Sequence, residues 1–288
     1  MPERHPLPPL VLCADDFGLS HEISATIARL ARGRCLNAIS CMAAMPGWSE
    51  DAALLDGIEE VSCGRLGQVQ VGLHLVLASE RPLGRMSCQQ IDGRLPGPDR
   101  MLALALTGRI DPDEIAYELD RQFLTFRAIH GRAPDFVDAH QHVHLYPVIR
   151  QQVIAATLRN APQAWVRVPD DRLLSMLARP FAGKAIGSTL HGLGFRRALR
   201  RAGLRANGSF AGHYDFRGNY RRYLDSFLRW GSEGHLVMCH PGQGEAPGDT
   251  IAAARPVEAD VIAELTLEER FDLALRPRRA APAVPAHG

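Results

Sequence analysis

The sequence predicts an α/β fold in which parallel strands form a distorted TIM-like (β/α) barrel within a single domain. Short apolar segments typical of buried strands alternate along the 288 residues with segments of helical spacing. Four of the predicted strands carry Asp or His at or near their carboxyl ends. Barrel enzymes build their sites from the loops that follow several different strands. A doubly wound open sheet is the alternative that this pattern leaves open.

The elements predicted for the first half are strands at 10–14, 38–44 and 69–77, a helix at 20–32, a helix that starts at 51, and a surface loop at 79–98. Ser20 favours a helix start because its hydroxyl can cap the first turn, and Gly33 favours the end of that helix. The loop is rich in Gly, Pro and polar residues, and loops of this length often carry function.

The elements predicted for the second half are helices at 111–130, 147–158 and 255–275, and strands at 136–139, 165–168 and 235–239. Asp111 precedes Pro112, which suits the first turn of a helix, and the acidic side chain suits its positive end. No linker divides the chain, so we expect one domain over 10–275, a flexible N-terminus over 1–9 and a disordered tail over 276–288.

A basic and apolar helical insert is predicted at about 172–214, where no acidic residue occurs between Arg172 and Asp215. Two interpretations remain open: surface helices that pack on the barrel, or a segment that contacts a membrane interface. The arginines of the predicted membrane contact are Arg196, Arg197, Arg200 and Arg201.

Composition argues against several classes of protein. The chain is 46% hydrophobic and 23% charged, and a formal net charge of +1 argues against a dedicated nucleic-acid binder. The six cysteines form no Cys-x-x-Cys pair, so a structural zinc knuckle is not expected. No signal peptide or membrane-spanning run is visible, which predicts a cytoplasmic protein with reduced thiols. The sequence leaves open whether the protein forms a homo-oligomer.

Two adjacent carboxylates, Asp15 and Asp16, follow the first predicted strand. Such a pair is costly at the end of a buried strand unless a metal or another partner stabilises it. A turn or helix-cap role is the alternative for a single Asp. Neighbours on an extended chain point in opposite directions, so one Asp could ligate a metal while the other reaches bound water.

Histidines supply the remaining candidate ligands. His74 lies in an apolar strand, where a lone histidine is usually a hydrogen-bonded core residue. His140, His142 and His144 alternate after the strand at 136–139; all three would share a face if extended, whereas only one or two need reach a metal if a loop begins there. Asp138 could accept a hydrogen bond from an imidazole and fix its tautomer. One Asp with two His suits a divalent metal and leaves a position for water.

His240 follows the strand at 235–239 and could donate a proton to a leaving group, although a turn-capping role is nearly as common. The histidines treated as background are His5, His21, His130, His191, His213 and His235.

Four motifs together resemble the YdjC/ChbG-like carbohydrate deacetylase family: ADDFGLS at 14–20, GLHL at 72–75, DAHQHVH at 138–144 and CHPG at 239–242. The resemblance extends from about 10 to about 275. It implies a distorted (β/α) barrel with one divalent metal ion, and hydrolysis of an N-acetyl group from an amino sugar. Zinc suits an Asp and two His, with Mg, Mn, Co and Ni as alternatives.

The resemblance also implies roles for individual residues. The implied metal ligands are Asp16, His74 and His140. Asp15 would be the general base and His240 the general acid. The residues expected behind the ligands or against the substrate are Asp138, His142, His144 and Arg167.

Chain length, the CHPGQGE segment at 239–245 and the predicted insert resemble more closely the hopanoid-biosynthesis branch, HpnK. This implies an N-acetylglucosaminyl hopanoid lipid as substrate and contact with the inner membrane surface. The alternatives are a deacetylase of soluble chitooligosaccharides, another metal-dependent barrel enzyme (aldolase, isomerase or phosphohydrolase), and a non-catalytic lipid- or sugar-binding protein.

Overall fold

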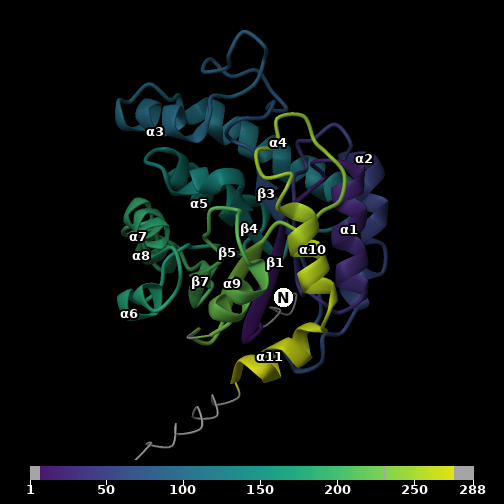
Figure 1. The fold of residues 1–288 in the computed structure, drawn as a ribbon. Helices are drawn as coiled ribbons and strands as arrows, with labels where there is room; N and C mark the ends of the chain where they lie inside the picture. Colours follow the sequence, from purple (N-terminus) through teal and green to yellow (C-terminus); the bar gives the residue numbers. More distant parts are fainter. Residues whose placement is uncertain (1–6, 230, 276–288) are drawn as a thin grey trace, which may run out of the picture.

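Eight short parallel strands form one sheet that curls into a half-barrel (Figure 1). The computed structural model describes residues 7–229 and 231–275. The strands are β1 (Leu10–Phe17), β2 (Ala38–Cys41), β3 (Gln70–Leu75), β4 (Phe136–Ala139), β5 (Trp165–Val166), β6 (Arg205–Ala206), β7 (Ser209–Ala211) and β8 (His235–Cys239).

The strand order is β6-β5-β4-β3-β2-β1-β8-β7, and every pairing between neighbours is parallel. Successive strands therefore lie side by side around the curve, as in a barrel, without the reversal of order of a doubly wound sheet. Within the described residues no ladder joins β6 to β7, so the sheet stays open there. The predicted distorted barrel is thus found as a curled half-barrel.

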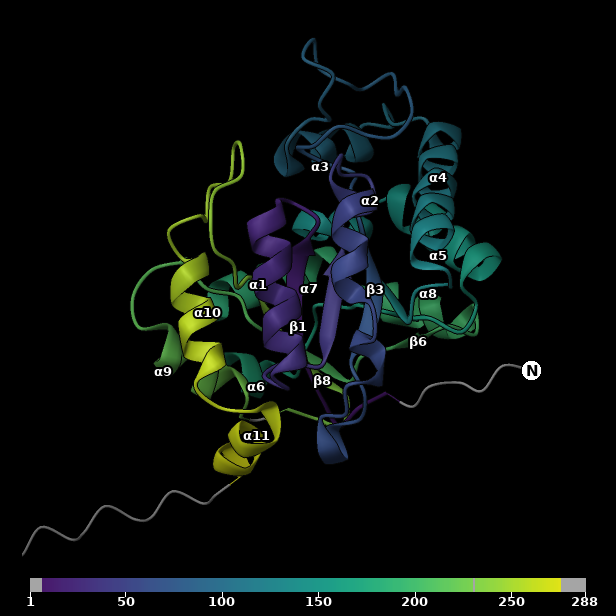
Figure 2. The ribbon, with the colours of Figure 1, turned by 90° about the vertical axis from the view of Figure 1, so that its right-hand side faces the viewer.

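Helices lie around the sheet (Figures 1 and 2). They are α1 (His21–Arg32), α2 (Trp48–Asp51), α3 (Pro98–Leu106), α4 (Pro112–His130), α5 (Ile149–Asn160), α6 (Leu173–Leu177), α7 (Ala182–His191), α8 (Phe195–Arg201), α9 (Tyr220–Phe227), α10 (Arg255–Ala263) and α11 (Leu267–Leu275). The described residues also contain four 3-10 helices: η1 (Ala52–Leu55), η2 (Ile58–Glu60), η3 (Gly64–Leu66) and η4 (His140–Leu145).

The capping residues act as the sequence predicted. The Ser20 side chain accepts a hydrogen bond from the backbone N–H of Ile23, and α1 ends at Arg32 with Gly33 as its C-cap. Asp111 likewise accepts hydrogen bonds from the first turn of α4, with Pro112 as its first residue. These caps fix the starts of two helices that flank the sheet.

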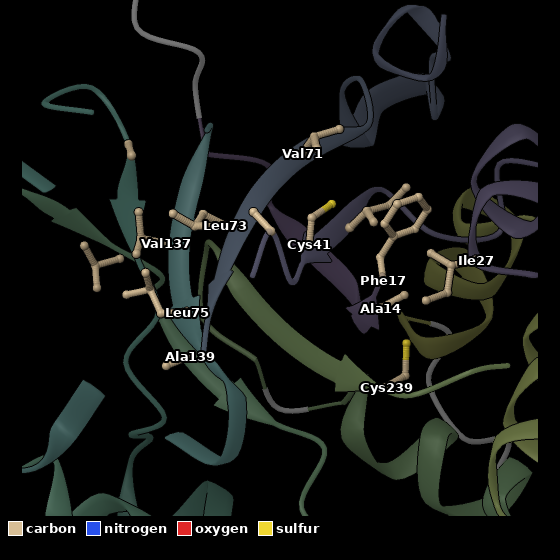
Figure 3. Close-up of a cluster of buried hydrophobic side chains, with 14 of the residues drawn as sticks. Ala14, Phe17, Ile27, Cys41, Val71, Leu73, Leu75, Val137, Ala139 and Cys239 are labelled. Atoms are coloured by element: carbon tan, nitrogen blue, oxygen red, sulfur yellow. The ribbon is translucent and has the colours of Figure 1, made fainter. Parts of the chain in front are cut away.

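Alternating side chains divide the apolar residues into an outer and an inner group. Leu10, Leu12 and Ala14 of β1 belong to the large cluster between sheet and helices, part of which is drawn in Figure 3. Val11 and Cys13 belong to a second cluster with residues of β4, β5, β7 and β8, which fills the concave side of the half-barrel. The polar groups described below lie beyond this inner cluster, at the carboxyl ends of the strands.

Several predicted boundaries were wrong. The strands expected at 38–44, 69–77 and 165–168 are shorter, because the chain leaves the sheet at its carboxyl edge where the site begins. The predicted helix at 255–275 is two helices, α10 and α11. The sequence did not predict α3, which follows the long loop directly.

The predicted insert at 172–214 is not confirmed as one helical unit. Its first part forms α6, α7 and α8, grouped on one side of the molecule (Figure 1), whereas its last part contributes β6 and β7 to the sheet. The exposed large apolar side chains of this segment are Leu173, Leu174, Leu177, Leu190 and Leu193.

None of the described helices combines the length and the apolar character needed to cross a bilayer. The predicted tail at 276–288 and residues 1–6 of the predicted flexible N-terminus lie outside the described residues.

Candidate metal centre

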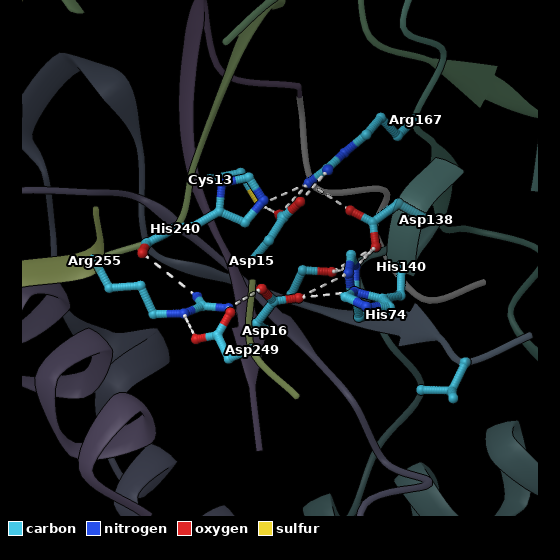
Figure 4. Close-up of polar contacts among 12 residues, drawn as sticks. Cys13, Asp15, Asp16, His74, Asp138, His140, Arg167, His240, Asp249 and Arg255 are labelled. Carbon is cyan, nitrogen blue, oxygen red and sulfur yellow. Dashed lines mark hydrogen bonds and ion pairs between the residues drawn. The ribbon is translucent and has the colours of Figure 1, made fainter. Parts of the chain in front are cut away.

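A bulge at the end of β1 places two carboxylates at the open end of the half-barrel. The pairing of β1 with β2 shifts register between Ala14 and Phe17, and Asp16 has a left-handed φ of 67°. This conformation is costly for a residue with a side chain and is often found at functional sites. Asp15 and Asp16 therefore both face the polar network in Figure 4. The sequence prediction of opposite directions assumed a regular strand, which the bulge interrupts.

Asp16, His74 and His140 converge from the ends of β1, β3 and β4. Their potential ligand atoms all lie within 4.8 Å of one another. The Asp16 Oδ1 atom is 3.0 Å from His140 Nδ1 and 3.4 Å from His74 Nε2. The side chain of His140 is 18% exposed, whereas the other two are 2% exposed. One carboxylate oxygen and two imidazole nitrogens fit a divalent cation such as zinc, and a substrate could reach it from the His140 side.

Hydrogen bonds fix the orientation of the His74 ring. Its Nδ1 lies 2.6 Å from Asp138 Oδ1 and 3.0 Å from Ser40 Oγ, and the Ser40 hydroxyl donates to the same carboxylate. This arrangement leaves Nε2 to face Asp16, as in metal sites where a carboxylate orients a ligating imidazole. Burial lowers the pKa of His74, but the negative charges of Asp138 and Asp15 outweigh it and raise the pKa to about 10.

Arg255 holds the second oxygen of Asp16. Its Nη2 donates to Asp16 Oδ2 at 2.7 Å, and its Nε donates to Asp249 at 2.6 Å. Burial raises the pKa of Asp16, but Arg255 and His140 outweigh this effect and hold it well below its usual range. Sequence reasoning missed Arg255, because a single arginine at a helix start carries no signal of a partner 239 residues away.

A second group of potential ligands lies beside the first and already contains a cation. Cys13, Asp15 and Asp138 also bring ligand atoms within 4.8 Å of one another. The Arg167 guanidinium lies among them, with both Asp15 oxygens at 2.6 Å, Asp138 Oδ2 at 2.5 Å and Cys13 Sγ at 3.1 Å. Its bidentate pairing with Asp15 fixes the position of that carboxylate. A metal at this position would have to displace a fully buried guanidinium.

His240 directly follows β8, which pairs with β1 next to the Asp pair. Its backbone N–H donates to Glu258 Oε2 at 2.6 Å, and Tyr214 donates to the other oxygen of Glu258. The His240 ring meets Phe216 edge-on, with 5.4 Å between centroids. Its Nδ1 is buried and has no hydrogen-bond partner among the described residues. The ring itself is only partly buried, so a substrate could reach it.

His142 and His144 do not share the face of His140. The strand ends at Ala139, and Gln141 and His142 adopt left-handed φ angles of 56°. The His144 Nε2 atom lies 3.0 Å from the carbonyl oxygen of Arg167, and burial lowers the pKa of His144 to about 4. The ring of His142 instead packs near His213, a residue that sequence reasoning assigned to the background.

Of the four arginines in the predicted membrane contact, one has hydrogen-bond or ion-pair partners among the described residues. Arg196 pairs with Asp170, with 3.0 Å between Nε and Oδ2, and donates to the carbonyl oxygen of Asn207. Arg197, Arg200 and Arg201 are exposed on α8. The structure thus leaves three of these side chains available to a partner.

Comparisons with known proteins extend over most of the chain. A family model described as YdjC-like protein matches residues 9–272. A chitooligosaccharide deacetylase of Serratia marcescens is 28% identical over 263 residues, covering 90% of this chain and 92% of the relative. A carbohydrate deacetylase of Homo sapiens is 27% identical over 257 residues, covering 83% of this chain and 76% of the relative.

A solved structure from Enterococcus faecalis V583 shares the fold, with a TM-score of 0.68 at 16% identity. The match covers 92% of this chain and 94% of that one, whose description names cellobiose-phosphate cleavage. None of these matches distinguishes the hopanoid-biosynthesis branch from the rest of the family.

Proposed function

Because this chain belongs to the YdjC-like protein family, we propose that it is a hydrolase that removes the N-acetyl group from an amino sugar. Relatives named chitooligosaccharide and carbohydrate deacetylases support this assignment. The observation that carries the proposal is the convergence of Asp16, His74 and His140 beside two groups suited to proton transfer, Asp15 and His240. The products are acetate and a free amine.

In this proposal Asp16, His74 and His140 hold one divalent cation, with zinc best suited to the donor set and Mg, Mn, Co or Ni as alternatives. When bound, such a cation supplies Lewis-acid polarisation of the amide carbonyl and makes water more acidic. Arg255 neutralises one oxygen of Asp16 and leaves the other facing the two imidazoles.

Asp15 is the proposed general base. Arg167 holds both of its oxygens, so the carboxylate is fixed in position, and each oxygen keeps a lone pair that can accept a proton from the attacking water. The same guanidinium also binds Asp138, which orients the His74 ring. Arg167 thus couples the position of the base to the position of a ligand.

His240 is the proposed general acid. An amide nitrogen is a poor leaving group until it is protonated, and an imidazolium can supply that proton near neutral pH. Glu258 holds the backbone of His240, and Phe216 packs against its ring. These contacts restrict the position of the ring beside the centre.

The finer proposal is that the acetylated amino sugar is lipid-linked, as in an N-acetylglucosaminyl hopanoid, and that the enzyme acts in the cytoplasm at the inner membrane surface. Support comes from the exposed leucines of α6–α8 and the exposed arginines of α8, which suit an anionic lipid surface. Helix α7 contacts the loop that leads to Phe216, because Lys184 donates to the carbonyl oxygen of Tyr214.

A deacetylase of soluble chitooligosaccharides is the second candidate, and the names of the Serratia marcescens and Escherichia fergusonii relatives favour it. Mass spectrometry separates the two. The enzyme is incubated with acetylated glucosaminyl lipid in vesicles and with acetylated chitooligosaccharides in solution. Loss of about 42 Da, an acetyl group replaced by hydrogen, identifies the substrate. Absence of this loss and of acetate from both panels would contradict the proposed function.

The Asp15→Asn variant tests the proposed base. It should keep its metal content but lose about 10²- to 10⁴-fold in kcat, because Asn cannot accept the proton. His240→Ala should behave similarly, since its proton donor is lost while the cation ligands remain. Metal analysis and acetate release measure the two properties separately, and full activity in Asp15→Asn would remove Asp15 from this role.

A further inference from the structure

We propose that the loop at 212–219, between β7 and α9, forms the wall that binds the pyranose ring of the substrate. In this arrangement Phe216 stacks on the sugar ring and His213 hydrogen-bonds its hydroxyl groups. The inference rests on the proposed function and adds to it residues that recognise the sugar rather than the acetyl group.

The loop passes along the side of the site between the proposed acid and the histidine-rich turn after β4. At one end, the Phe216 ring lies edge-on to the His240 ring, with centroids 5.4 Å apart. At the other end, the His213 ring lies 5.5 Å from the His142 ring. The loop therefore borders the place where the nitrogen-bearing sugar must lie for His240 to protonate its leaving nitrogen.

Phe216 has a strained backbone conformation although it packs against the edge of the apolar core. Its φ is 61°, a left-handed value that costs a bulky aromatic residue free energy. Its ring touches Tyr214, with centroids 4.7 Å apart, yet the residue is only partly buried. A strained aromatic residue at the rim of a site, neither in the core nor fully in solvent, is typical of a group held in place for a ligand.

His213 offers a hydrogen-bonding group that the protein leaves without a partner. Among the described residues, no donor or acceptor meets its buried Nε2, and the same holds for Nδ1 of His142. Burial and the positive charge of Lys184 lower the pKa of His213 to about 4, so its imidazole is neutral near pH 7. A neutral imidazole can accept or donate, and a sugar hydroxyl can satisfy either role.

The chemistry of a pyranose matches these two ends. Its faces carry C–H groups that gain free energy when they leave water against an aromatic ring, and its edge carries hydroxyls that need partners. Phe216 meets the first requirement and His213 the second. The amino sugar that bears the acetyl group is therefore the proposed occupant, whether its far end is another sugar or a lipid.

Steady-state kinetics with acetylated chitooligosaccharides of two to five units test the wall. Phe216→Ala should raise KM about tenfold or more while kcat changes less than about threefold, since the ring binds ground state and transition state alike. His213→Ala should raise KM by about fivefold or more, and His213→Gln should recover part of the loss. Tyr117→Ala is the matched control, because Tyr117 is 64% exposed on the outer helix α4 and should leave both constants unchanged.

Phe216→Gly separates binding from folding. Glycine accepts the left-handed backbone, so thermal stability should match or exceed that of the wild type, whereas KM should rise as in Phe216→Ala. KM within twofold of the wild type in both Phe216 variants would overturn the proposed wall. A fall in stability with no change in KM would also overturn it, because the ring would then be structural.

The wild type distinguishes failure of the wall from failure of the proposed function. If the wild type releases acetate and the Phe216 and His213 variants have the same KM as the wild type, only the proposed wall is rejected. Calorimetric binding of the same oligosaccharides without acetate release rejects the deacetylase, and weaker binding by Phe216→Ala then still supports the wall. A wild type that neither binds nor deacetylates any of these sugars, nor the acetylated glucosaminyl lipid, contradicts both.

Discussion

Two groups of potential metal ligands lie side by side in this protein, and they differ in what compensates their charge. Each brings three ligand atoms within 4.8 Å of one another. In the group of Cys13, Asp15 and Asp138, the compensating cation is the buried guanidinium of Arg167. In the group of Asp16, His74 and His140, two imidazoles face one carboxylate oxygen, and His140 reaches solvent. Ligand type and spacing alone therefore do not identify a metal site.

The comparison also shows how one group supports the other. Asp138 belongs to the guanidinium group through Arg167, yet it orients His74 of the neighbouring group. A permanent internal cation fixes the carboxylates, while the more exposed group keeps nitrogen donors available to an ion from solution. We expect loss of the Arg167 cation from the first group to lower stability, and loss of a ligand from the second group to lower metal binding and activity.

His140→Ala should give the largest effect. Removal of one of three ligands should abolish stoichiometric metal binding and lower kcat/KM by about 10³-fold or more, equivalent to about 4 kcal/mol. Plasma mass spectrometry gives the metal content and acetate release gives the rate. His191→Ala, at an exposed histidine on α7, is the control. Unchanged metal content in His140→Ala would show that the group of Asp16, His74 and His140 is not the metal site, and the proposed difference between the two groups would be lost.

Arg167→Ala should cost stability. Two buried carboxylates would lose their cation, and breaking a buried ion pair from one side destabilises by about 3–5 kcal/mol. Denaturant unfolding in the presence of a chelator measures this effect without a contribution from metal. Arg167→Lys should be intermediate, because an ammonium cannot bind both Asp15 oxygens in the same plane. A loss below about 1 kcal/mol would show that the guanidinium is not needed to hold the group.

The sequence predicted the parts of this arrangement that depend on local residues. Caps at Ser20 and Asp111 define two helices, and the positions of Asp and His after apolar strands indicated the candidate ligands. The bulge at Asp16 could not be predicted, because strand alternation assumes regular pairing. The pairing of Arg167 with Asp15 spans 152 residues, so neither carries a local signal of the other.

Strand length explains the remaining errors in the fold. β6 has two residues and β7 has three, which is too short for an alternating pattern to appear, so both were absorbed into the predicted helical insert. Register with the neighbouring strands, which only the folded chain provides, defines these elements.

A buried histidine in neither group should give the smallest effect. Burial lowers the pKa of His235 to about 4, below the value of about 6.5 expected in the unfolded chain. As the pH falls, the unfolded state therefore binds the proton before the folded state does. The contribution of neutral His235 to the free energy of unfolding is fully present above about pH 6.5 and is lost as the pH falls towards 4. Between pH 7 and pH 5 the loss is about 2 kcal/mol.

The His235→Gln variant should lack this part of the pH dependence, as measured by denaturant unfolding at both pH values. Its acetate release should keep the wild-type pH profile, since His235 lies at the other end of β8 from His240. An altered pH profile of activity would show that His235 contributes to the site.

The difference between the two groups is tested most directly by anomalous scattering from crystals of the wild-type protein grown with zinc. The account predicts one peak at about 2.0–2.2 Å from Asp16 Oδ1, His74 Nε2 and His140 Nδ1, with the Arg167 guanidinium still between Asp15 and Asp138. A peak among Cys13, Asp15 and Asp138, or none beside Asp16, would contradict it.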